Sequence, residues 1–93
     1  MTTFFVPYVQ EKPAAVDING HRLLILTSVA DDLTSDLDKL GGTEVRTLEV
    51  QGNEQQVLLN LAASIEGGVV LTPPGVAITT MIASLKRELP WLH

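Results

Sequence analysis

Four consecutive apolar residues at positions 23–26, with the sequence LLIL, constrain the fold more than any other feature of this chain. An unbroken apolar run is typical of a strand buried on both faces, as the central strand of a parallel sheet is. The dipeptide Asn19-Gly20 shortly before the run favours a type I′ turn, because both central residues of that turn need positive φ. These features predict a hairpin that leads into a central strand over residues 21–27.

Strand and helix patterns alternate after this run. Ser28 and Asp31 have the spacing of a capping box, and leucines recur at helical spacing until the Gly-Gly pair at 41–42. A second Gly-Gly pair at 67–68 follows the next helical pattern, and both pairs predict helix ends. The further elements expected from these patterns are a polar strand over 44–50, a helix that begins after Asn53, a short buried strand over 69–72 and a helix over 76–89.

The alternation predicts a single α/β domain over residues 1–93, because a chain of this length has no room for a second core. The order strand–strand–strand–helix–strand–helix–strand–helix is typical of a small Rossmann-like layered domain with right-handed crossovers. We expect residues 21–93 to form a βαβαβα core with three parallel strands. Residues 1–20 are expected to add an N-terminal β extension, as an antiparallel hairpin and edge strand.

The composition of the strands predicts their order in the sheet. Strand 21–27 is expected in the middle, with 44–50 and 69–72 on its two sides. The run over 3–10 contains Pro7, which cannot donate a hydrogen bond to a ladder. We therefore expect this first strand at a sheet edge, or with a bulge.

Composition and charge argue against several classes of partner. The chain has 11 acidic and 6 basic residues, a net charge of −5, and its basic residues are scattered. Duplex nucleic acid needs clustered cations, so it is not an expected partner. The absence of cysteine excludes disulfides and thiolate zinc sites, and no apolar run has the length of a signal peptide or a membrane span. We expect a soluble, cytoplasmic protein that does not bind a membrane.

The expected architecture also predicts where a ligand binds. In an open parallel sheet, ligands lie beyond the carboxyl ends of the strands, here between strands 21–27 and 69–72. Free backbone amides at the start of the last helix would face this crevice and hold an anion. The predicted ligand-binding residues are Thr27, Ser28, Asp31, Thr72, Pro73, Pro74, Gly75 and Val76.

Several of these residues also have a purely structural interpretation. Pro73 and Pro74 can simply end a strand and begin a helix. Ser28 can be a helix cap with no role in ligand binding. A catalytic serine needs a base, but His21 lies at the far end of the central strand and His93 is the last residue. The sequence has no dinucleotide-binding or phosphate-loop motif and no carboxylates converging from several elements. We therefore expect no catalytic residue, no metal and no cofactor.

Aromatic side chains gather in two places. Phe4, Phe5 and Tyr8 lie in the first predicted strand, and Trp91 follows the last helix. We expect these four residues at an interface between copies of the chain, since aromatic residues are enriched in interface hot spots. The alternatives are that Trp91 packs back on the core and that Pro7 prevents edge pairing.

Two hypotheses about function follow. The first is a non-enzymatic binding or regulatory module, homodimeric, that holds a small anionic ligand or a protein partner at the carboxyl ends of the parallel strands. The alternative is a small enzyme that acts on a phosphate- or nucleotide-containing substrate. In that case the backbone amides of residues 72–77 would stabilise negative charge, and Thr27, Ser28 or Thr72 would orient the substrate. The lack of a nucleophile–base pair favours the binding module.

Overall fold

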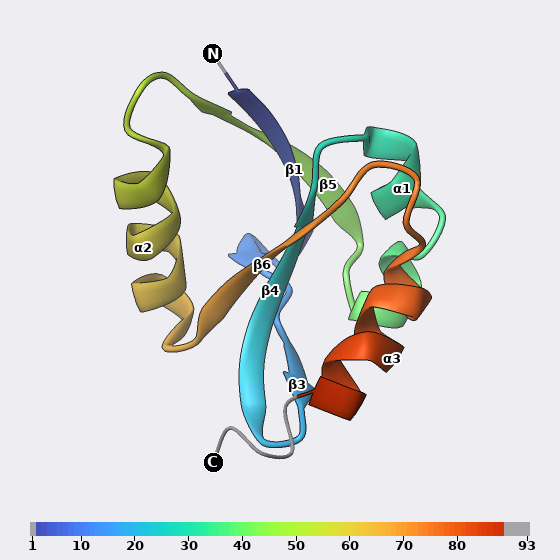
Figure 1. Cartoon of the computed structure of the whole chain (residues 1–93). Coiled ribbons are helices and arrows are strands. Elements are labelled where there is room, and N and C mark those ends of the chain that lie inside the picture. Colours follow the sequence, from blue (N-terminus) through green and yellow to red (C-terminus); the bar gives the residue numbers. More distant parts are fainter. Residues whose placement is uncertain (1, 89–93) are drawn as a thin grey trace.

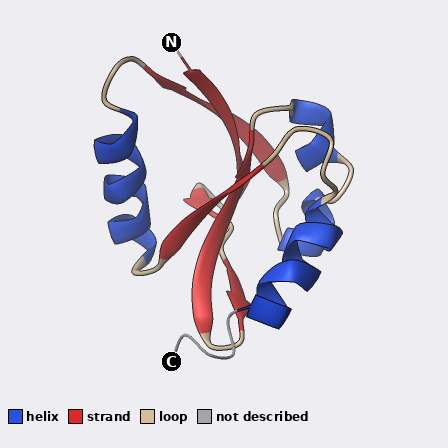
Figure 2. Ribbon diagram, viewed as in Figure 1, coloured by secondary structure: helices blue, strands red, loops and turns tan. Residues whose placement is uncertain are grey.

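The apolar run at positions 23–26 lies in β4 (His21–Thr27), where Leu24, Ile25 and Leu26 are almost completely buried. The computed structural model describes residues 2–88, in which a six-stranded mixed sheet lies between two layers of helices (Figures 1 and 2). The other strands are β1 (Thr2–Val9), β2 (Lys12–Pro13), β3 (Val16–Ile18), β5 (Glu44–Val50) and β6 (Gly68–Thr72). The helices are α1 (Ala30–Thr34), the short 3-10 helix η1 (Leu37–Leu40), α2 (Glu54–Ile65) and α3 (Ile78–Glu88).

The neighbours of β4 confirm part of the predicted sheet. β3 and β4 form an antiparallel hairpin whose turn residues Asn19 and Gly20 have φ of 52° and 86°, as a type I′ turn requires. β6 lies alongside β4 in the parallel direction, in a register that ends with Thr27 opposite Thr72. The α/β class and the parallel pairing of 21–27 with 69–72 are therefore confirmed.

The position of β1 differs from the prediction. β1 pairs along its length with β5, in the antiparallel direction, and its other neighbours are β4 and β2. β1 therefore lies inside the sheet, and the prediction of an N-terminal edge strand is wrong. Because β1 separates β5 from β4, the predicted pairing of 44–50 with 21–27 is also wrong. β5 runs in the same direction as β4 and β6, but within residues 2–88 it is paired with neither.

Pro7 is tolerated inside the sheet because its nitrogen, which has no hydrogen to donate, points between β4 and β2, the two strands that pair with β1 on that side. In an antiparallel strand, the nitrogen and the carbonyl of one residue point to the same side. The Pro7 carbonyl accepts a hydrogen bond of 2.8 Å from the Ala14 amide, so the ladder with β5 loses no donor. On that same side β4 pairs with β1 at Phe5 and β2 pairs with it at Tyr8, and Pro7 lies between these positions.

Alternation along the strands gives the sheet two apolar faces. One face packs against α2, and the buried cluster there consists of Phe4, Val6, Leu24, Leu26, Val50 and Ile65. The other face packs against α1, η1 and α3, and its buried cluster consists of Ile18, Ile25, Leu33, Leu40 and Ile78. A single helix thus covers the first face, whereas α1, η1 and α3 share the second (Figure 1).

The turn between α2 and β6 uses its glycine pair differently from the prediction. The C-cap of α2 is Glu66, which itself adopts the left-handed conformation with φ of 55°. Gly67 is needed for close packing, because a Cβ there would collide with the carbonyl oxygen of Arg22 in β4. The bare Gly67 backbone therefore lets β6 begin directly against β4.

Two further expectations concern the C-terminal residues and membrane-spanning helices. Trp91, an expected interface residue, lies outside the described residues, as does His93. No helix within residues 2–88 is long and apolar enough to cross a membrane.

Candidate functional site

β4 and β6 end side by side, because they are parallel and Thr27 lies opposite Thr72. A pocket of about 290 Å³ lies at these carboxyl ends, where the sequence predicts a ligand. Asp31, Gly75 and Val76 do not line this pocket, and the role of the lining residues in ligand binding stays a prediction. The predicted residues that do line it are Thr27, Ser28, Thr72, Pro73 and Pro74, joined by Phe4, Leu26 and Leu71.

Ser28 lines the pocket without capping a helix. The N-cap residue of α1 is Val29, in extended conformation, and no side chain donates or accepts a capping hydrogen bond there. The predicted capping box of Ser28 and Asp31 is therefore wrong. Val29 is in extended conformation, so α1 begins one residue later than the pattern indicates.

The pocket offers little to a charged ligand. The Thr27 hydroxyl is buried and already donates a hydrogen bond of 3.0 Å to the Val29 carbonyl. The Thr72 hydroxyl is buried as well, and no residue in the described part of the chain bonds to it. The remaining walls are mostly apolar side chains, namely Phe4, Leu26, Leu71, Pro73 and Pro74. Such a lining suits an apolar group better than an anion.

The loop after β6 does not present the free amides that the sequence predicts. The Gly75 amide donates a hydrogen bond of 3.1 Å to the Asp32 carboxylate, and the Val76 amide bonds to the Pro73 carbonyl. The amides of Gly75 and Val76 are therefore not free, which contradicts the prediction at these two residues, and anion binding by the first turn of α3 stays a prediction. Asp32 is the residue that sequence analysis missed, since it selected the neighbouring Asp31 instead.

The histidine of β4 lies far from this pocket, and the described residues form no metal centre. His21 begins β4 and Thr27 ends it, so the two lie about 20 Å apart along an extended strand. Within residues 2–88, no group of three or more histidine, aspartate or glutamate side chains is placed to hold a metal ion.

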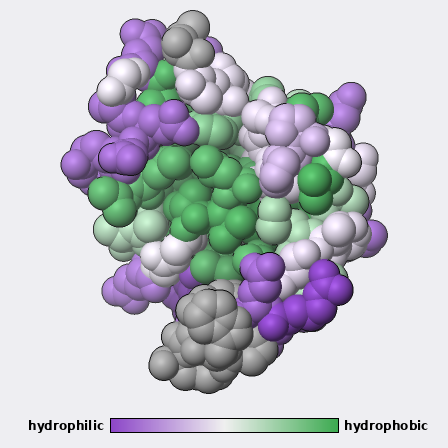
Figure 3. Space-filling view, in the orientation of Figure 1, coloured by the Kyte–Doolittle hydropathy of each residue, from purple (hydrophilic) through white to green (hydrophobic). Residues whose placement is uncertain are grey.

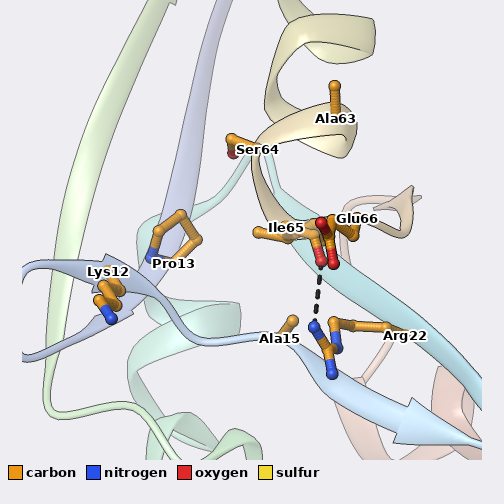
Figure 4. Close-up of a pocket in the computed structure, with 8 residues that line it drawn as sticks. All are labelled: Lys12, Pro13, Ala15, Arg22, Ala63, Ser64, Ile65 and Glu66. Atoms are coloured by element: carbon orange, nitrogen blue, oxygen red, sulfur yellow. Dashed lines mark hydrogen bonds between the residues drawn. The ribbon is translucent and has the colours of Figure 1, made fainter.

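A second pocket, of about 560 Å³, lies near the other end of β4 and contains two of the basic side chains (Figure 4). Arg22 points toward the last turn of α2 and donates a hydrogen bond of 3.3 Å to the Ile65 carbonyl. Its Nε also lies 3.9 Å from a carboxylate oxygen of Asp17. Arg22 therefore stabilises the carbonyl end of a helix, where a cation is favoured, and Lys12 is the other cation at the pocket.

The largest exposed apolar side chains of α2 and β6 lie around a groove of about 520 Å³ between these two elements. Leu59 of α2 is 64 % exposed and Leu71 of β6 is 41 % exposed. Figure 3 shows apolar surface gathered in the middle of this view, with hydrophilic surface around much of its rim. The groove has no charged lining residue; it is formed by Gln55, Leu58, Leu59, Ala62, Gly67, Gly68, Val69 and Leu71. We call this region the β6 edge surface.

The aromatic residues of β1 lie away from any open sheet edge. Phe4 is in the core, and Phe5 and Tyr8 are half-buried in a strand that has neighbours on both sides. The Arg46 guanidinium lies over the Tyr8 ring, 4.4 Å from its centroid, and its hydrogen bond to Glu44 raises the pKa of this arginine. β1 therefore offers no open edge for pairing with another copy, and a role of Phe4, Phe5 and Tyr8 in an interface stays a prediction.

Comparisons of the chain with protein-family models, with curated proteins and with solved structures find no match.

Proposed function

We propose that this chain is a non-enzymatic binding module whose partner is a protein, bound at the β6 edge surface. The observation that carries this proposal is the uncharged groove between α2 and β6, with Leu59 and Leu71 exposed beside it. Contiguous exposed apolar surface on a small domain typically marks an interaction site. In a chain with a net charge of −5, a groove of this size without a charged residue is a specific feature.

The backbone of β6 supports the same proposal. Within the described residues β6 is paired with β4 alone, so the outer side of the strand offers unpaired amides and carbonyls. An extended segment of a partner can pair with such an edge and place apolar side chains in the neighbouring groove. The pocket at the strand ends shares Leu71 with the groove, so it would take one apolar side chain of the same partner.

Small anions are the less favoured ligand in this proposal. The Gly75 amide already bonds to Asp32, and the pocket walls are mostly apolar. No observation in the described structure favours the alternative of an enzyme acting on a phosphate-containing substrate. A regulatory role and a cytoplasmic location stay predictions.

Selection from a displayed random peptide library, together with anion titrations, tests this proposal. We expect selected peptides to bind the wild-type chain and the Val29→Asp variant, and to lose binding to the Leu59→Asp variant. Val29 is the matched control, because it is an exposed apolar residue outside the β6 edge surface. In NMR spectra of the labelled chain, inorganic phosphate and ATP should leave the amides of Thr72 and residues 75–77 unshifted. Saturable shifts there, with no peptide binding that depends on Leu59, would contradict the proposal.

A further inference from the structure

We propose that the β6 edge surface binds a second copy of this chain, through antiparallel pairing of β6 with β6 about a two-fold axis. This inference rests on the proposed function, because it identifies the protein that the same surface binds. The result would be one continuous sheet running through both copies.

The two edges of the sheet differ in a way that points to β6. β5 has β1 as its neighbour, and this edge strand carries the charged residues Glu44, Arg46 and Glu49. Charged side chains on an edge strand oppose pairing with another chain. β6 has the sequence GVVLT, with no charge and no proline to protect it. Of the edge strands β5 and β6, β6 is therefore the one suited to pairing.

A two-fold axis allows β6 of one copy to pair with β6 of the other. An axis perpendicular to the sheet reverses the strand direction, so β6 meets its copy in the antiparallel direction. The same axis keeps each helix layer on its own face of the sheet. The α2 helices of the two copies then lie on the same face, and Leu59 and Leu71 of each copy are covered by apolar surface of the other.

The charges of the second helix layer match this arrangement. The bond between Gly75 and Asp32 holds the acidic first turn of α1 at the carboxyl end of β6. A bond of 2.9 Å from the Asn19 side chain to the Lys86 carbonyl holds the last turn of α3, which carries Lys86 and Arg87, near the opposite end. These two ends of the layer are far apart in Figure 1. Antiparallel pairing brings the acidic end of each copy toward the basic end of the other.

Sedimentation equilibrium over a range of concentrations tests the inference. We expect the wild-type mass to rise to that of a dimer, and the substitutions Leu59→Lys and Leu71→Lys to raise the dimer Kd by about 30-fold or more. Val29→Ser should leave the Kd unchanged, because Val29, at 37 % exposed, is as accessible as Leu71 but lies outside the surface, and serine adds no charge beside the acidic first turn of α1. Circular dichroism of each variant checks that the fold is retained.

Amide exchange locates the interface independently of any substitution. We expect the outward-facing amides of β6 to exchange more slowly as the concentration of wild-type chain increases, while the β5 edge does not change. A monomeric mass at every concentration would overturn the inference, as would a dimer that both lysine variants leave intact. Peptide binding that depends on Leu59, measured on monomeric chain at low concentration, would then show that only the choice of partner is wrong and that the proposed function stands.

Discussion

At Gly67, a missing side chain determines how closely the turn after α2 approaches the backbone of β4. A Cβ at Gly67 would meet the Arg22 carbonyl oxygen, whereas a Cβ at Gly68 would meet only the tip of the Leu23 side chain, at 3.1 Å. We expect Gly67→Ala to lower the free energy of unfolding by about 1–3 kcal/mol, because backbone cannot move aside without shifting the strand. Gly68→Ala should change it by less than about 1 kcal/mol. Urea denaturation compares the two, and equal losses would contradict this account.

Single residues also show where prediction from the sequence stops. Asp31 and Asp32 are adjacent acidic residues, and successive residues of a helix point about 100° apart. Which of them reaches Gly75 depends on where α1 begins, and the start at Val29 rather than Ser28 turns Asp32 toward the loop. The sequence thus predicts an acidic residue beside the loop, but an error of one position in the helix start selects the wrong one.

At the scale of elements, a pairing was predictable where a turn signal or a shared apolar composition indicates it, and it was not predictable where neither is present. The β3–β4 hairpin has its own turn signal, and β4 and β6 share the apolar composition that favours their pairing, although β6 lies at the edge of the sheet and is only partly buried. The pairing of β1 with β5 joins segments far apart in the sequence and has no local signal. Pro7 favours an edge for β1, and its actual place depends on the Ala14 bond, which only the folded chain shows.

The central position of β1 predicts that its aromatic residues stabilise the monomer. Phe4 is 6 % exposed and belongs to the cluster beneath α2. We expect Phe4→Ala to lower the free energy of unfolding by about 3–5 kcal/mol, because it leaves a cavity in the core. Thr2→Ala, at an exposed position of the same strand, should change it by no more than about 0.5 kcal/mol. Urea denaturation well below the dimer Kd measures both; a small loss for Phe4→Ala would indicate that β1 is dispensable.

At the scale of the whole molecule, the proposed dimer predicts a dependence on the charges at its two ends. Asp31→Lys should weaken the dimer several-fold, because it places like charge opposite Lys86 and Arg87 of the other copy. The combination of Asp31→Lys with Lys86→Asp should restore part of the lost affinity, as measured by sedimentation equilibrium. A dimer in which these two ends do not face each other would show no such rescue.

The sequence predicts an interface at β1, whereas the proposed dimer has its interface at β6. The two differ because the exposure of a strand depends on which strand ends the sheet, and the sequence does not show this.

The place of β1 between β4 and β5 also affects how the chain is made. Thr2 pairs with Val50, so β1 leaves the ribosome before β5 and cannot complete its pairing with β5 until residue 50 has followed it. At about 5–20 residues per second, that interval lasts roughly 2–10 s. During those seconds the FFVPYV segment remains without its partner strand, and it offers apolar surface that a nascent-chain chaperone would protect.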